Sequence, residues 1–131
     1  TTDALGASFL GSALGTDLVN PNVIRAAQGS LFATPTTSVD RRSAISWCDE
    51  NTAVVVLRPT DSVSIWTLDL TGPTSIVIGA EHDGVSSEWD DVGVGASIPM
   101  VGMADSLNAS VSAAIILAEA RRQRSAGTFT T

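Results

Sequence analysis

The sequence predicts an α/β domain with a largely parallel sheet, because short β-branched runs alternate with segments that carry helix-start signals. Its 131 residues are enough for one compact domain. Apolar residues make up 44% and charged residues 16%, a balance typical of chains that fold. Every apolar run is far shorter than the roughly 20 residues that a membrane span needs.

Four runs are predicted to be strands: residues 7–10, 53–57, 75–78 and 96–98. Residues 53–57 read Ala-Val-Val-Val-Leu without polar alternation. Such a run is typical of a central strand that is buried on both faces. We therefore expect it to lie in the middle of the sheet.

Three segments are predicted to be helices. Asn20 with the following proline, and Asp40, are N-cap signals for the first two. The last helix, residues 108–124, lacks Gly and Pro and ends in arginines that complement the helix dipole. Its apolar residues form more than one stripe, so we expect it to cover both the sheet and a partner subunit.

The two ends of the chain carry weaker signals. Residues 1–5 are typical of the end of a helix that runs into the first strand, and residues 125–131 are expected to be a flexible tail. The lone Cys48 cannot form an internal disulfide, which favours a core position and a reducing, cytoplasmic compartment.

The chain is acidic, with a net charge of -7, and all seven of its basic residues are arginine. An acidic surface repels phosphate backbones, which argues against nucleic acid as a partner. Alternatively, the acidity serves solvation, as in salt-adapted organisms. Composition does not decide between the two interpretations.

A glycine follows the predicted strand at residues 75–78, and the run continues Ala-Glu-His-Asp-Gly84. In one interpretation, Gly79 lets the backbone approach a ligand at the carboxyl end of the strand. Gly79→Val would then abolish binding and leave the fold largely intact. In the other, the segment is a tight turn that needs two glycines with positive φ. Glycine-rich motifs that cradle phosphates are absent from the sequence.

Two further segments carry candidate functional residues. Residues 98–108 mix apolar and polar side chains and lead into the last helix, which Ser106 or Asn108 would cap. The same side chains, together with the free amides of the first turn, could hold a polar ligand. In residues 20–32, Arg25 and Gln28 share a helix, either as plain surface residues or as RNA contacts.

Residues 20–32, 76–86 and 98–124 together resemble the SpoU (TrmH-like) family of RNA methyltransferases in the SPOUT superfamily. The likeness covers nearly the whole chain and keeps the order and spacing of the motifs. It implies a SPOUT-type parallel sheet flanked by helices, a C-terminal trefoil knot and a homodimer. It also implies transfer of a methyl group from S-adenosylmethionine to a ribose 2′-hydroxyl of ribosomal or transfer RNA. We expect no metal and no membrane partner.

The resemblance also implies roles for individual residues. Four positions match cofactor contacts: Gly79, Ile98, Met100 and Leu107. Glu81 matches a carboxylate of the family, and Ser106 and Asn108 match polar residues near the reaction centre. His82 is expected to face solvent.

One motif of the family is missing. Motif 1, Asn-x-Gly-x-x-x-Arg, carries the arginine assigned to activating the ribose hydroxyl, and residues 1–7 resemble what directly follows it. We therefore interpret residues 1–124 as a SpoU-type domain that lacks motif 1. The alternatives are a non-catalytic, S-adenosylmethionine-binding dimerisation module and a small-ligand binder without affinity for that cofactor.

Overall fold

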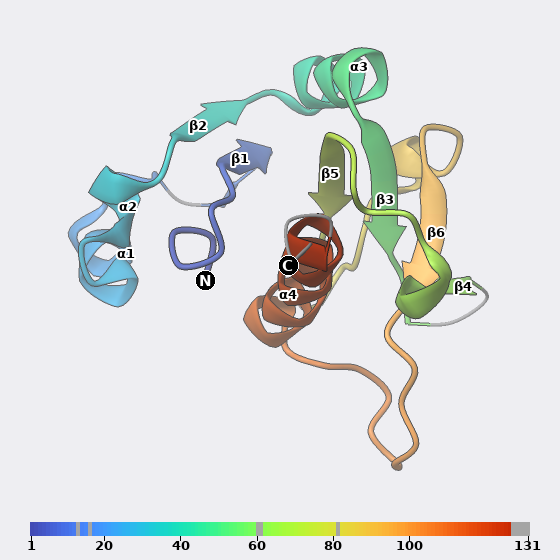
Figure 1. Ribbon diagram of the computed structural model, residues 1–131. Coiled ribbons are helices and arrows are strands. Elements are labelled where there is room, and N and C mark those ends of the chain that lie inside the picture. Colours follow the sequence, from blue (N-terminus) through green and yellow to red (C-terminus); the bar gives the residue numbers. More distant parts are fainter. Residues whose placement is uncertain (13, 16, 60–61, 81, 127–131) are drawn as a thin grey trace.

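The computed structural model describes residues 1–12, 14–15, 17–59, 62–80 and 82–126, whose strands form two parallel sheets flanked by helices (Figure 1). The elements follow in the order β1 (Phe9–Ser12), α1 (Pro21–Ala27), α2 (Ser30–Ala33), β2 (Thr36–Val39), α3 (Arg41–Asn51), β3 (Ala53–Leu57), β4 (Val63–Ser64), the 3-10 helix η1 (Ile65–Thr67), β5 (Thr74–Val77), the 3-10 helix η2 (Ser87–Trp89), β6 (Val94–Ser97) and α4 (Ala109–Ala126). Strands β1 and β2 pair with each other, and the larger sheet has the order β4-β6-β3-β5. The predicted α/β class with parallel pairing is confirmed.

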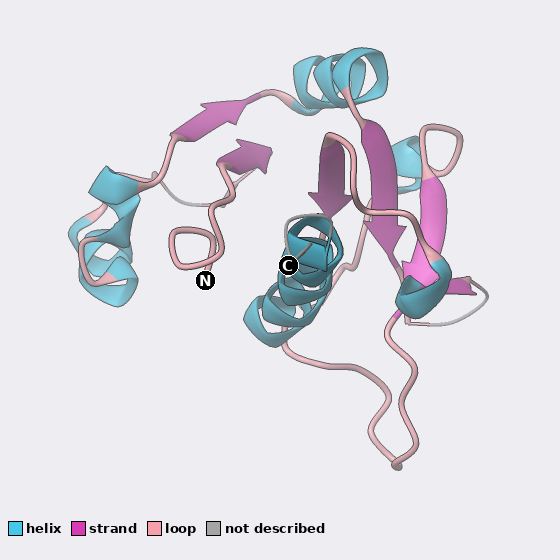
Figure 2. Ribbon diagram, viewed as in Figure 1, coloured by secondary structure: helices cyan, strands magenta, loops and turns pink. Residues whose placement is uncertain are grey.

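The central strand β3 is buried on both faces, as its unbroken apolar run predicts. Val55 packs with Ile116 and Ala120 of α4 on one face. Val54 and Val56 pack on the other face, against residues of α3 and η2. Cys48 lies in this second cluster at 4% exposure, so its predicted core position is confirmed. In Figure 2, α4 lies in front of β5, and the long irregular loop between β6 and α4 extends away from the sheet.

The predicted helix starts are confirmed by their capping bonds. The Asn20 side chain accepts the Asn22 N–H at 2.9 Å, and Asp40 accepts the Ser43 N–H at 3.0 Å. Helix α1 is short because Gln28 takes a left-handed conformation with φ of 50° and ends it. A separate helix, α2, follows, which the sequence did not predict.

Several predicted boundaries are wrong by two or three residues. β1 starts at Phe9, because Ala7 donates its N–H to the Thr2 carbonyl and Gly6 has φ of 68°. This is the hydrogen-bonding pattern with which helices end. The expected tail is also wrong at Ser125 and Ala126, which belong to α4, and residues 127–131 lie outside the described residues. Strand β6 covers Val94–Ser97 in place of the predicted 96–98.

The carboxyl end of α4 is tied to the segment that precedes β5. The Gln123 side chain donates to the Leu68 carbonyl at 3.0 Å and accepts the Leu70 N–H at 2.8 Å. Arg124 donates to the carbonyls of Leu70 and Gly72, at 2.9 and 2.7 Å. These side chains satisfy backbone groups that no strand pairing reaches. The helix is thereby fixed along its axis relative to the larger sheet.

Glu119 anchors this end of the helix. Its carboxylate is buried to 8% exposure and accepts two hydrogen bonds from Arg122, at 2.8 and 2.7 Å. Gln123 donates a third at 2.8 Å. The bonds from Arg122, followed by the one from Gln123, lower the pKa of Glu119 to about 2.

We expect this carboxylate to make the fold sensitive to acid. Its folded pKa lies below its ordinary value of 4.5, so its stabilising contribution is present above pH 4.5 and is lost as pH falls toward 2. In Glu119→Gln, the free energy of unfolding should be lower at pH 7 and should fall less steeply in acid. Urea titrations from pH 7 to pH 2.5 measure both effects. Parallel pH profiles for the two proteins would contradict this assignment.

Candidate functional site

The loop that follows β6 borders an open, shallow cavity of about 440 Å³, called the loop cavity below. Its lining residues come from the end of β6, from the loop that follows it and from the turn after β3: Pro59, Ser97, Ile98, Pro99, Met100, Gly102, Ala104 and Asp105. The strands of the larger sheet are parallel, so the cavity lies at the carboxyl edge, where ligands bind in open α/β sheets. Two of the predicted cofactor residues, Ile98 and Met100, therefore line one cavity.

The lining combines apolar and polar surface in nearly equal parts. Two prolines, Ile98 and Met100 form its walls, and the Asp105 carboxylate is the charged group among the described residues that line it. Arg58 directly precedes the lining residue Pro59, and its guanidinium pairs with the Asp90 carboxylate. A cavity of this kind suits a ligand with a flat apolar part and a positive charge better than it suits a phosphate.

Gly79 occupies the neighbouring loop but does not line the cavity. It follows β5, and β5 and β6 flank β3, so both loops leave the same edge of the sheet. The Gly84 N–H bonds to the Ala80 carbonyl at 2.9 Å, which closes the loop on itself. A Cβ at Gly79 would lie 2.0 Å from the Gly84 carbonyl carbon. The close approach at Gly79 is therefore made by the backbone of the chain itself.

Two expectations about this glycine segment need correction. Gly84 has a positive φ of 65°, whereas Gly79 does not, so only one of the two glycines is needed for its φ. The expectation that Gly79→Val leaves the fold largely intact is wrong, because the side chain would enter the Gly84 and Val85 backbone. His82 is exposed, as expected, and Glu81 lies outside the described residues.

The polar residues before α4 have a structural role that the geometry shows directly. The Asn108 side chain accepts the Ser110 N–H at 2.8 Å and the Ser110 hydroxyl at 2.7 Å, and thus caps α4. Ser106 is exposed and Leu107 is half-buried. These predicted site residues lie in the loop that forms the cavity, but they do not line it.

The predicted RNA contacts lie elsewhere. Helix α1, with Arg25, is on the far side of the molecule from the loop before α4 (Figure 1). The Arg25 guanidinium donates to the Asn22 side chain at 2.8 Å, and Gln28 is exposed at the end of the helix. A single copy of the chain therefore does not bring these residues to the loop cavity.

A second cavity, of about 490 Å³, lies at the smaller sheet. Residues after β1 and one residue of β2 line it: Leu14, Gly15, Asp17, Leu18 and Ser38. This second cavity is slightly larger than the loop cavity but contains none of the predicted site residues. Volume alone therefore does not identify the loop cavity as the candidate site. Among the described residues, no cluster of three metal-ligating side chains occurs, and no helix is long and apolar enough to cross a membrane.

Sequence reasoning singled out two of the eight residues that line the loop cavity; of the other six, Pro99, Gly102, Ala104 and Asp105 lie within the candidate segment 98–108, and Pro59 and Ser97 lie outside it. Pro59 comes from a distant part of the sequence, and only the parallel pairing of β3 with β6 brings it here. Asp105 directly precedes the predicted site residue Ser106. Its place in the loop before α4 was therefore the sequence signal that could have identified it.

We expect Gly79→Ala to destabilise the fold by about 1–3 kcal/mol, because backbone atoms must shift to admit the Cβ. Gly102→Ala is the matched control: it also lies in a loop at this edge, and its Cβ would meet nothing within 4 Å. Its stability should stay within about 0.5 kcal/mol of the parent. Urea denaturation measures both. Equal stability of all three proteins would show that the Gly79 loop differs from the one described.

Comparison with known proteins connects this geometry to a family. The family described as "SpoU rRNA Methylase family" matches residues 1–118. A 23S rRNA (uridine(2479)-2'-O)-methyltransferase from Streptomyces viridochromogenes is 36% identical over 136 residues, which cover 97% of this chain and 47% of that protein. A tRNA (guanosine(18)-2'-O)-methyltransferase from Thermus thermophilus is 55% identical over 58 residues, covering 44% and 30%.

A solved structure supports the same family. The SpoU methyltransferase AviRb from Streptomyces viridochromogenes, in complex with the cofactor AdoMet, matches with a TM-score of 0.87 and 33% identity. The match covers 95% of this chain and 53% of AviRb. The chain thus spans about half the length, or less, of these relatives. With a family match over residues 1–118, the chain belongs to the SpoU rRNA methylase family.

Proposed function

We propose that the chain is the catalytic portion of an RNA 2′-O-ribose methyltransferase that uses S-adenosylmethionine. The observation that carries this proposal is the loop cavity, lined by Ile98 and Met100, in a chain of the SpoU family. Both curated relatives are named as RNA 2'-O-methyltransferases, and a structural relative holds AdoMet. The substrate would be ribosomal or transfer RNA.

The residues present fit the cofactor. A volume of about 440 Å³ lies in the range of small-molecule sites, and the apolar walls suit the faces of an adenine ring. The Asp105 carboxylate would favour a positively charged ligand over an anionic one. When bound, S-adenosylmethionine supplies an electrophilic methyl group on a sulfonium. We also propose Gly79 and Leu107 as cofactor contacts, from the loop after β5 and the loop before α4.

The chemistry requires help for the nucleophile. A ribose hydroxyl holds its proton at neutral pH, so transfer needs a group that removes or stabilises that proton. Glu81, Ser106 and Asn108 are our candidates for orienting the hydroxyl. Alignment of the oxygen with the methyl group contributes up to about 7–11 kcal/mol in well-oriented systems. The group that the family resemblance implies for this task is the motif-1 arginine, whose guanidinium would stabilise the ribose oxygen as its proton leaves.

A homodimer and a C-terminal trefoil knot are parts of the same proposal. Ile116 and Ala120 of α4 are buried against the sheet, whereas Val111 on the same helix is 45% exposed. Val101 and Met103 in the loop before α4 are fully exposed. A second copy would cover these apolar side chains. The second copy would also contribute its own Arg25 and Gln28, our candidate RNA contacts, to the assembly that contains the loop cavity.

The alternative is a cofactor-binding dimerisation module without catalysis. The observation in its favour is that the described residues that line the loop cavity include no basic side chain to act on the ribose hydroxyl.

Activity separates the two functions. We expect the 131-residue chain to bind S-adenosylmethionine by calorimetry but to transfer tritiated methyl groups to ribosomal or transfer RNA feebly or not at all. An extended chain with the motif-1 arginine should be active, and its Arg→Ala variant should not. Full activity of the 131-residue chain would overturn the need for that arginine. Absence of cofactor binding in both chains would contradict the proposed function.

The oligomeric state is a second test. Sedimentation at micromolar concentration should give a dimer of the 13.4 kDa chain, and Val111→Glu should shift it toward monomer, because the charge would enter an apolar interface. Circular dichroism serves as the control for folding. A parent chain that is monomeric with its fold intact would contradict the dimer.

A further inference from the structure

An exposed tryptophan lies beside the loop cavity. Trp66 belongs to η1 and keeps 52% of its surface exposed, although the residue before it, Ile65, is completely buried. A half-exposed indole is a large apolar surface in contact with water. The sequence gives no indication of it, because residue 66 lies outside the motifs that resemble the family.

The backbone beneath this indole is held firmly. The Ser64 hydroxyl accepts the Trp66 N–H at 3.3 Å, and the Thr67 hydroxyl donates to the Ser64 carbonyl at 2.8 Å. Ile65 is buried in the core cluster against which Ile98 packs. The backbone of Trp66 is therefore fixed, so that only the two side-chain torsions of the indole remain to be ordered when a ligand contacts it.

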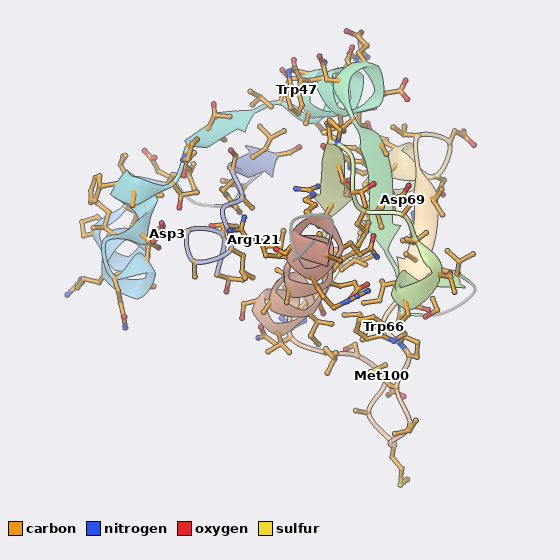
Figure 3. All side chains as sticks on the ribbon, viewed as in Figure 1. Asp3, Trp47, Trp66, Asp69, Met100 and Arg121 are labelled. Carbon is orange, nitrogen blue, oxygen red and sulfur yellow. The ribbon has the colours of Figure 1, made fainter. Side chains whose placement is uncertain are left out.

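The sheet places Trp66 next to the cavity. In the parallel pairing of β4 with β6, Ser64 lies opposite Ser97, and Ser97 and Ile98 line the loop cavity. Trp66 follows Ser64 by two residues, and Met100 follows Ser97 by three. Figure 3 shows Trp66 at the point from which the loop with Met100 extends.

The charges around this position disfavour a phosphate ligand. Asp105 is the charged group among the cavity-lining residues, and the side chain of Arg58 is paired with Asp90. The whole chain carries a net charge of -7. Contact with RNA at this edge therefore has to use uncharged groups, and stacking of a base on an aromatic ring is such a contact.

We propose that Trp66 is a stacking surface for an unpaired nucleobase of the RNA substrate, beside the cofactor cavity. The inference rests on the proposed function and adds the residue that contacts the RNA near the reacting ribose. An unpaired base fits because its flat face matches the exposed indole, whereas a base within a duplex is already stacked.

The test compares two tryptophans of nearly equal exposure. Trp47 on α3 is 55% exposed and lies at the opposite end of the larger sheet from Trp66 (Figure 3). With a fluorescently labelled single-stranded RNA as the probe, Trp66→Ala should weaken binding about tenfold or more. Trp47→Ala should bind like the parent, and Trp66→Phe should keep most of the affinity.

Three further readouts separate stacking from a structural role. Trp66→Ala should leave the melting temperature, the affinity for S-adenosylmethionine and the salt dependence of RNA binding unchanged, because stacking releases no counterions. Unchanged RNA affinity in Trp66→Ala would overturn the proposal. So would a loss of cofactor affinity, which would assign the indole to the cofactor, or a loss of the dimer, which would assign it to the subunit interface.

The parent chain distinguishes failure of this inference from failure of the proposed function. A parent that binds S-adenosylmethionine but not the RNA probe contradicts the stacking role alone. A parent that binds neither contradicts the proposed function, and the stacking role with it.

Discussion

The burial of β3 on both faces is the constraint from which the rest of the larger sheet follows. Val54, Val55 and Val56 are all nearly inaccessible to solvent, and each buried valine contributes about 1.5–3 kcal/mol relative to an exposed one. Successive side chains point to opposite faces, so one strand needs α4 on one side and α3 on the other. Its two parallel neighbours, β5 and β6, then direct the Gly79 loop and the loop cavity to the same edge.

Polar contacts fix the position of α4 along the larger sheet, which apolar packing alone does not determine. A helix that packs only through aliphatic side chains can slide along a sheet, but Gln123 and Arg124 bind backbone groups of residues 68–72 at defined positions. The other end of α4 is defined by the Asn108 cap. The loop between β6 and α4 therefore spans two fixed points, which accounts for a cavity in a stretch without regular structure.

The sequence predicted those parts of the fold whose causes are local. The bounds of β3 and the caps at Asn20 and Asp40 depend on neighbouring residues and were correct. Strand β2 was missed because it reads Thr-Thr-Ser-Val, with two exposed positions, and exists through its pairing with β1. The strand candidate near residue 96 was placed too late, because β6 begins with the exposed Val94 followed by Gly95, a residue type that is depleted in strands.

The candidate site was predicted less completely than the fold, for a physical reason. A glycine needed for close approach has the same sequence signal whether the approaching group is a ligand or the chain itself, and at Gly79 it is the Gly84 backbone. Likewise, a residue such as Pro59 reaches the cavity only through strand pairing between segments about forty residues apart. Such juxtapositions are properties of the topology and leave no mark on the local sequence.

The distribution of the arginines bears on how an acidic chain can act on RNA. Arg41, Arg58 and Arg122 pair with carboxylates, Arg124 binds backbone carbonyls, and Arg25 binds its own helix. Within the described part of the chain, this leaves the guanidinium groups of Arg42 and Arg121 without a hydrogen bond or a close ion pair, although the charge of Arg42 helps to lower the pKa of Glu88. Phosphate binding gains free energy from each cation that releases counterions, so two separate guanidinium groups contribute little of it. Stacking of a base on an uncharged surface does not require free cations. The exposed indole of Trp66 therefore contributes a larger share of RNA binding in this acidic chain than it would in a basic one.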